Sequence, residues 1–295
     1  MKIISGRSHV QLAKRLAINL GAPYVHTQIE TFNDLELRIQ ILEPLYEQDV
    51  VIVQSTSKPA NDYLMELLLL VDTAKRAGAK RIIAVVPYFG YGRQDRPSYD
   101  YGPISARLVA TLLEAAGVDH LITLDFHSKQ LLGFFKIGVQ NVEPLPLFTP
   151  HVKDLTQSII ISPDIGGLIR ARKFSETFNI NLAIINKSRD ASRTCHMSEI
   201  IGNVCGKHCI LIDDIVDTAG TLCQAAELLM QQGAVSVEAF ITHGVLSGEA
   251  IERIQRSAIR NIFITDSIVN GTLPDKFKVV SVVNVLSDAL RRLNG

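Results

Sequence analysis

The sequence predicts an α/β protein of two similar domains, each built on a mainly parallel sheet flanked by helices. Three observations lead to this prediction. Strand-like and helix-like segments alternate along all 295 residues, which is typical of successive βαβ units. The order of segments in the first half returns in the second half. A hydrophobic content of 47% is sufficient for two sizeable cores.

The internal repeat is clearest around two apolar strands that each lead through a polar loop into a helix, a Gly-Ala pair and another strand. The matching segments are strands 51–53 and 210–212, helices 63–76 and 222–232, and strands 82–86 and 237–242. Two prolines interrupt the pattern in Glu143–Leu147, so we place the boundary there. The predicted domains are 1–143 and 144–295, with the active site in the cleft between them.

The stretch 210–222 carries the most informative pattern. A buried strand runs into Asp213 and Asp214, and a short glycine-bearing loop then opens a helix. The loop consists of Asp217, Thr218, Ala219, Gly220 and Thr221. Its N–H groups and hydroxyls suit a phosphate dianion, whereas the two carboxylates suit sugar hydroxyls or a hydrated divalent cation. The stretch therefore predicts a site for a phosphorylated sugar.

Two further inferences concern the same loop. We expect Gly220 to be required there, because a β-branched side chain would obstruct the loop and its φ angle would not suit one. The sequence G-x-x-x-x-G-K-[ST] is absent from this stretch, so it is no ATP-binding P-loop. The alternative interpretation is an acidic turn whose Asp and Thr side chains only cap the helix.

In the first half, the strand ending at Val86 leads into an aromatic, glycine-bearing loop with Arg93, Gln94 and Arg96. Guanidinium groups bind phosphate oxygens and stack on bases, so this loop is a candidate nucleotide site, the alternative being a solvated basic loop. His127 follows the strand 121–124. A histidine there can bind a metal or a phosphate, or it can be purely structural.

In the second half, Asp164 lies in a loop with two glycines that opens a helix, the shape of an anion or metal-water site. Lys187 and Arg189 follow the strand 182–185, where two cations can stabilise developing phosphate charge, although such a pair is usually part of a surface loop. Phe32–Glu36 indicates by itself no more than a helix start or an exposed turn.

Composition excludes several classes of protein. Lys plus Arg and Asp plus Glu both number 30, so the basic footprint of a nucleic-acid binder is missing. The longest apolar run, 64–71, contains Glu66 and is too short to span a bilayer, and no signal peptide is visible, so we expect a cytoplasmic protein without a membrane partner. The four cysteines are better explained as reduced thiols than as a zinc site.

The order of these motifs resembles, nearly end to end, the ribose-phosphate pyrophosphokinase (PRPP synthetase) family of the phosphoribosyltransferase-like fold. Its most diagnostic pieces are Arg93–Arg96 and Asp213–Thr221. A phosphoribosyltransferase would account for only one of the two domains. A catalytically silent PRPP-binding or regulatory homologue would have no reason to keep Lys187, Arg189 and His127 together.

The resemblance implies transfer of the pyrophosphoryl group of Mg-ATP to the anomeric hydroxyl of ribose 5-phosphate, giving 5-phosphoribosyl 1-diphosphate (PRPP) and AMP for nucleotide biosynthesis. ATP is the co-substrate and Mg²⁺ the cofactor. The first domain would serve ATP and the second ribose 5-phosphate. The matching element Phe32, Asp34 and Glu36 receives adenine across a subunit interface in the family, which implies a homo-oligomer, a dimer or a larger assembly up to a hexamer.

The remaining roles implied by the resemblance are the ATP-binding pair Arg93 and Gln94; the magnesium ligands His127, which also contacts ATP, and Asp164; the catalytic cations Lys187 and Arg189, the latter also touching substrate; and the ribose 5-phosphate site Asp213, Asp214 and Asp217 to Thr221. The chain departs from the family in three places. Leu35 stands where Gly is usual, and Ser188 stands where Arg is common. The segment 97–102 has no cation where typical members carry several, which help to bind activating phosphate and inhibitory ADP.

Overall fold

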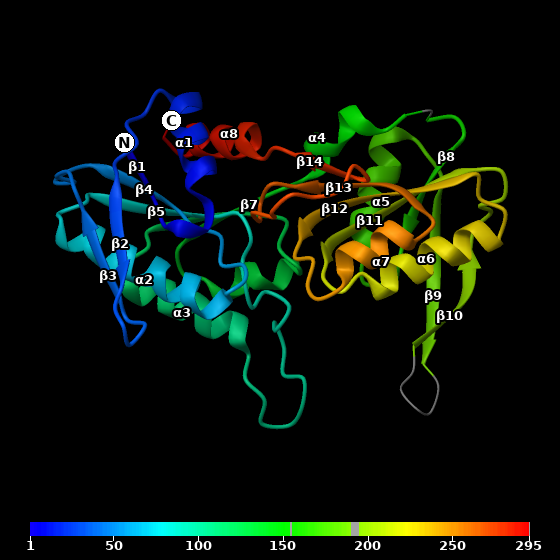
Figure 1. Ribbon diagram of the computed structural model, residues 1–295, viewed down its shortest axis with the longest axis horizontal. Coiled ribbons are helices and arrows are strands. Elements are labelled where there is room, and N and C mark those ends of the chain that lie inside the picture. Colours follow the sequence, from blue (N-terminus) through cyan, green and yellow to red (C-terminus); the bar gives the residue numbers. More distant parts are fainter. Residues whose placement is uncertain (154, 190–194, 295) are drawn as a thin grey trace. The chain divides into compact units, whose positions relative to one another are not determined.

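The computed structural model describes residues 1–153, 155–189 and 195–294, which form two compact units (Figure 1). The first unit comprises Met1–Glu143, Ser267–Val269 and the described residues from Val282 onward. The second comprises the described residues within Pro144–Asp266 and Asn270–Ser281. Both units are α/β structures, as the alternating pattern predicts.

The first unit is built on a five-stranded parallel sheet in the order β1-β4-β5-β6-β7. Its strands are β1 (Lys2–Ser5), β4 (Asp49–Val53), β5 (Arg81–Val86), β6 (His120–Leu124) and β7 (Gly138–Val142). Its helices are α1 (Val10–Leu20), α2 (Ala60–Arg76), α3 (Ser105–Ala116) and α8 (Val283–Asn294), with 3-10 turns at Arg7–His9 and Lys129–Phe134. A separate antiparallel hairpin joins β2 (Thr27–Thr31) to β3 (Leu37–Ile41).

Successive side chains of each strand point to opposite faces of the first sheet, and helices cover both faces. Side chains such as Ile4 and Ile52 belong to the core beneath α2 and α3. Helices α1 and α8 pack against each other, and they contact β1 and β4 (α1) and β6 and β7 (α8). Both faces of a parallel sheet are thus buried, and each large aliphatic side chain removed from water contributes roughly 1.5–3 kcal/mol.

The second unit is built on a seven-stranded sheet in the order β10-β9-β8-β11-β12-β13-β14, antiparallel only between β9 and β10. Its strands are β8 (Ser158–Ser162), β9 (Leu182–Arg189), β10 (Cys195–Ile201), β11 (His208–Val216), β12 (Ser236–Gly244), β13 (Ile259–Thr265) and β14 (Phe277–Val280). Its helices are α4 (Leu145–Phe148), α5 (Leu168–Phe178), α6 (Gly220–Gln231) and α7 (Ala250–Arg256), with a 3-10 turn at Thr149–His151. Phe148 and Phe174 fill the core on the α5 face, and aliphatic residues of α6 and α7 fill the other.

Two expectations need correction. The second domain does not extend to the end of the chain, because α8 packs on α1 and Arg291 Nη2 donates to the Asn19 carbonyl at 2.8 Å, so residues 282–294 complete the first unit. The strand before the phosphate loop does not stop at Ile212. It continues to Val216, since β12 is long enough to pair with it as far as Gly244. Among the described helices, none is both long and apolar enough to cross a membrane.

Candidate functional site

The loop between β11 and α6 has the geometry of an anion site. Ala219 takes the left-handed φ of 61°, and the first intrahelical bond of α6 runs from the Cys223 N–H to the Ala219 carbonyl at 3.0 Å. Within the part of the chain that the structure describes, the N–H groups from Thr218 to Thr221 donate no hydrogen bond. Donors left open at a helix N-terminus are available to a phosphate dianion.

The carbonyl side of the same loop is held from elsewhere in the second unit. The N–H of Ser247 donates to the Asp217 carbonyl at 3.0 Å, and Arg253 Nη1, from α7, donates to the Thr218 carbonyl. The loop therefore has its acceptors engaged while its donors stay available. The role of Arg253 could not be predicted from the sequence, because it lies 35 positions from Thr218 and only the packing of α7 beside α6 brings the two residues together.

Gly220 is not needed for the reason that the sequence suggests. Its φ is not in the left-handed region; the residue in that region is Ala219. A Cβ added to Gly220 would meet nothing nearer than Arg253 Nη1 at 3.7 Å. The backbone therefore tolerates a side chain there, and such a side chain would instead occupy space beside the open N–H groups of the loop.

Two carboxylates near the carboxyl end of β11, just before this loop, lie close to one arginine. Arg170 Nη1, from α5, is 3.4 Å from Asp214 Oδ1 and 3.8 Å from Asp213 Oδ1. The Asp214 N–H donates to Asp213 Oδ1 at 3.0 Å. Asp214 is buried, whereas 28% of the Asp213 side chain is exposed. Asp213 is thus the carboxylate that a sugar can reach, and Arg170, which the sequence analysis missed, partly neutralises the pair.

Electrostatics single out Asp213. Burial, followed by the neighbouring Asp214 carboxylate, raises the pKa of Asp213 well above its usual range, and Arg170 offsets part of the rise. The Asp164 carboxylate adds a smaller contribution to the rise in the pKa of Asp213. An acid held in this way gains from any ligand that donates hydrogen bonds or brings positive charge, which a ribose or a cation would do.

Asp164 lies between β8 and α5, where its Oδ1 accepts from the Gly167 N–H at 2.9 Å and its carbonyl accepts from Ser162 Oγ at 2.6 Å. Among the described residues, no group of three or more His, Cys, Asp or Glu is arranged to hold a metal ion by itself. Mg²⁺ commonly binds through one or two carboxylates together with substrate phosphates and keeps several waters, so Asp164 by itself is a candidate ligand.

The predicted ATP residues lie beyond the carboxyl ends of β5 and β6 in the first unit. Gln94 is tied to the start of α3, since Ser105 Oγ donates to its Oε1 at 2.6 Å and the Ala106 N–H donates to its carbonyl at 3.2 Å. Arg93 and His127 are exposed. His127 belongs to the first unit, whereas Asp164 belongs to the second.

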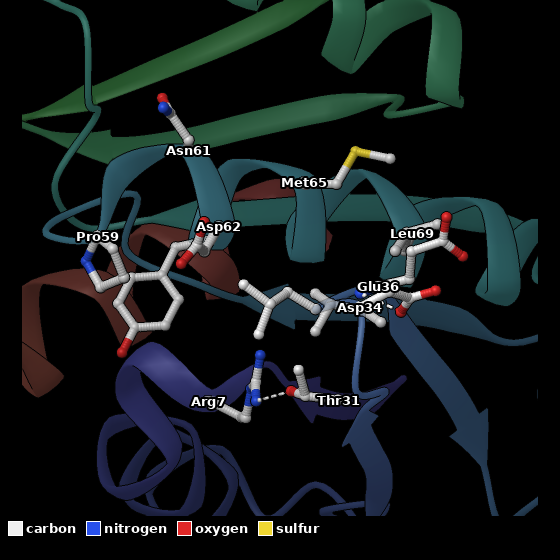
Figure 2. Close-up of a pocket in the computed structure, with 12 residues that line it drawn as sticks. Arg7, Thr31, Asp34, Glu36, Pro59, Asn61, Asp62, Met65 and Leu69 are labelled. Atoms are coloured by element: carbon white, nitrogen blue, oxygen red, sulfur yellow. Dashed lines mark hydrogen bonds between the residues drawn. The ribbon is translucent and has the colours of Figure 1, made fainter.

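Phe32, Asp34 and Glu36 form the tip of the β2–β3 hairpin. The Phe32 N–H donates to the Glu36 carbonyl at 2.8 Å, and the Glu36 N–H donates to Asp34 Oδ1 at 3.1 Å. Leu35, which stands where the resemblance makes Gly usual, takes a left-handed φ of 71° and is 79% exposed. The tip borders a cavity of about 920 Å³ between the hairpin and α2 (Figure 2).

Lys187 and Arg189 are the last predicted site residues. Both lie in β9, but their side chains are outside the part of the structure that is described. Their assignment therefore stays a prediction.

Comparison with known proteins covers nearly the whole chain. Residues 1–117 match the model described as the N-terminal domain of ribose phosphate pyrophosphokinase, and residues 192–295 match the phosphoribosyl synthetase-associated domain. The chain is 46% identical to a ribose-phosphate pyrophosphokinase of Agrobacterium fabrum over 99% of its own length and 96% of the relative's. It is 44% identical to that of Helicobacter hepaticus, over 99% and 95%. A crystal structure of phosphoribosylpyrophosphate synthetase from Mycobacterium smegmatis superimposes with a TM-score of 0.93 at 33% identity, covering 100% of this chain and 99% of that one.

Proposed function

Because the chain belongs to the ribose-phosphate pyrophosphokinase family, we propose that it transfers the pyrophosphoryl group of ATP to ribose 5-phosphate, giving PRPP and AMP. The observation that carries this proposal is the site in the second unit. A loop with open N–H groups lies beside Asp213, which is partly exposed, so one sugar phosphate can bind with its phosphate on Thr218–Thr221 and its hydroxyls on the acid. Near end-to-end similarity to two-domain synthetases argues against a phosphoribosyltransferase.

In the proposed reaction the anomeric oxygen forms a bond to the β-phosphorus of ATP. The bond from that phosphorus to the oxygen of the α-phosphate breaks, AMP leaves, and the anomeric hydroxyl loses its proton. Transfers of this kind depend mainly on positioning and on electrostatic stabilisation of the phosphoryl oxygens. The loop and Asp213 fix the ribose, and Arg93 and Gln94 hold ATP. Lys187 and Arg189 stabilise the charge that builds on the bridging oxygen.

Mg²⁺, with His127 and Asp164 as protein ligands, would neutralise phosphate oxygens of the nucleotide. Asp164 suits this role because it offers a carboxylate oxygen, the type of ligand that Mg²⁺ prefers, from the loop that opens α5. Its loop is also fixed by the bond from the Gly167 N–H, which limits the movement of the carboxylate.

The adenine site is completed by a second copy of the chain in this proposal. Phe32, Asp34 and Glu36 lie at an exposed hairpin tip, with 49% of Phe32 accessible, so they are available to a neighbouring subunit. An aromatic ring and two carboxylate acceptors suit the face and the exocyclic amine of adenine. The functional form is therefore at least a dimer.

The direct test is to incubate the purified protein with MgATP and ribose 5-phosphate and to follow phosphorus NMR signals. We expect AMP and PRPP in equal amounts, no product without ribose 5-phosphate, and none with unphosphorylated ribose as a control. Formation of ADP would indicate ordinary phosphoryl transfer. Binding of both substrates without turnover would identify a silent homologue and refute the proposal.

A further inference from the structure

A buried acid lies behind the hairpin tip. Glu66, on α2, is fully buried, and its Oε2 accepts from Arg7 Nε at 2.6 Å. Its Oε1 accepts from the Arg7 backbone N–H at 2.5 Å and from Gln54 Nε2 at 2.9 Å. A buried carboxylate is stable only with such partners, so Glu66 and Arg7 fix each other's position.

The same network joins β1, β4 and α2 into a rigid base. Gln54 Oε1, also fully buried, accepts from the N–H and the hydroxyl of Ser8 at 3.1 and 2.6 Å. A Cβ on Gly6 would lie 2.4 Å from Gln54 Oε1 and 2.5 Å from Glu66 Oε1. Only glycine therefore lets the two side chains close over the end of β1, and their positions are tightly determined.

From this base the Arg7 guanidinium reaches the hairpin. Its Nη1 donates to Thr31 Oγ1 at 3.0 Å, a bond drawn in Figure 2. Thr31 is the last residue of β2 and is followed directly by Phe32. The planar guanidinium reaches its two partners from two separate nitrogens in fixed directions, Nε for Glu66 and Nη1 for Thr31, whereas an ammonium group has a single nitrogen.

The tip has few other supports. Its described hydrogen bonds are internal, between Phe32 and Leu35 and between Asp34 or Phe32 and Glu36. The cavity of about 920 Å³ separates it from α2, whose side chains Asp62 and Met65 line the opposite wall (Figure 2). Packing under the hairpin involves Ile29, Ile39 and Ile41, nearer its base.

We infer that Arg7 is a positioning residue for the ATP site: held by buried Glu66, it fixes the end of β2 through Thr31 and so sets the conformation of the tip Phe32–Glu36. This inference rests on the proposed role of the tip in binding adenine. In this inference Arg7 acts on ATP binding through the hairpin. Its effect is to spare ATP binding the entropic penalty of ordering an exposed loop.

The test uses variants that leave Glu66 with a charged partner. Thr31→Val removes the hydroxyl that accepts from Arg7 while keeping the side-chain shape and the strand preference. Arg7→Lys keeps the charge beside Glu66 but lacks the Nη1 group that donates to Thr31. Thr31→Ser retains the hydroxyl. Arg38→Met is the matched control, because it breaks an exposed ion pair of the same hairpin, Arg38 to Glu30 at 3.7 Å, away from Arg7.

We expect Thr31→Val and Arg7→Lys each to raise KM for ATP at least threefold, while kcat and KM for ribose 5-phosphate stay within twofold. Amide exchange at Phe32 and Leu35 in the unliganded protein should quicken at least threefold. The double variant should be no worse than the more severe single one, because both break the same bond. Thr31→Ser and Arg38→Met should behave like the parent protein.

The two hypotheses fail in different ways. Unchanged exchange in Thr31→Val overturns the positioning role of Arg7. Faster exchange with unchanged KM for ATP also overturns it, provided that Glu36→Ala raises that KM. If Glu36→Ala leaves KM for ATP unchanged, the adenine role of the tip is refuted, and exchange alone then decides whether Arg7 positions the hairpin.

Discussion

Leu35 illustrates how one backbone angle limits a residue's choice. A leucine at φ 71° bears a strain on the order of 1 kcal/mol that glycine does not. Glycine, the usual residue of the family at this position, avoids this strain. The leucine side chain of this chain is 79% exposed there, so it needs no packing space. The strain makes external support of the tip, such as that from Arg7, more important.

Arg253 is expected to matter for ribose 5-phosphate and not for ATP. Arg253→Met removes the donor that holds the Thr218 carbonyl, so the phosphate loop loses part of its fixed conformation. A charge-assisted hydrogen bond at an exposed position corresponds to about 1–2 kcal/mol, or roughly a 5- to 30-fold rise in Kd. Calorimetric titration of ribose 5-phosphate measures this.

The control for that variant is Arg256→Met on the same helix. Arg256 is 84% exposed and faces Glu252 at 3.8 Å, away from the loop. It should leave the affinity for the sugar phosphate unchanged. Equal losses in the two variants would show that α7 has only a general effect on stability.

Asp213→Asn should lose activity and gain stability. The pKa of Asp213 is raised in the folded protein, so above that pKa its ionisation disfavours the folded state. This destabilisation shrinks as the pH falls below the folded pKa and is gone below the pKa of the unfolded chain. The neutral amide lacks the penalty. We expect a higher Tm than the parent near pH 8, a gap that narrows on acidification, and roughly 10- to 100-fold lower kcat/KM for ribose 5-phosphate. A lower Tm at pH 8 would contradict the electrostatic account.

At the scale of elements, the β9–β10 pair extends from the edge of the second sheet and carries the predicted catalytic cations. Lys187→Ala should lower kcat several hundredfold with nearly unchanged ATP affinity, because a cation aimed at transition-state charge supplies about 3 kcal/mol there and little in the ground state. Steady-state kinetics together with equilibrium ATP binding separate the two effects. Near-normal turnover would remove Lys187 from the mechanism.

At the scale of the whole molecule, a tip that serves a neighbour makes the active site a property of the assembly. Oligomers of Glu36→Ala chains and oligomers of Lys187→Ala chains are each expected to have low activity. Hybrid oligomers of the two should recover activity, because some of their active sites then combine an intact Glu36 from one chain with an intact Lys187 from the other. The experiment is subunit exchange followed by an assay for AMP. Oligomers shown to be mixed but still inactive would argue against a shared site.

Independence of inorganic phosphate is a further prediction for the whole molecule. The segment 97–102 has no cation, and Asp100 within it is exposed, so a dianion finds none of the usual partners there. Two lost charge-assisted contacts of about 1.5–3 kcal/mol each weaken phosphate binding well over tenfold. We expect full activity in phosphate-free buffer and purely competitive inhibition by ADP against ATP. A protein nearly inactive until millimolar phosphate is added would refute this prediction.

The sequence by itself determined the fold class, the repeat and the family, because these follow from local patterns. Alternating apolar periodicity specifies strands and helices, and the loop from Asp213 to Thr221 keeps its chemistry wherever its strand and helix form. Tertiary packing decided what depends on residues far apart in the chain. Only the fold returns α8 to the first unit, extends β11 along β12, places Arg253 at Thr218 and Arg170 at Asp214, and sets Arg7 between Glu66 and Thr31. Those contacts join segments dozens of residues apart, so no periodicity or spacing in the sequence records them.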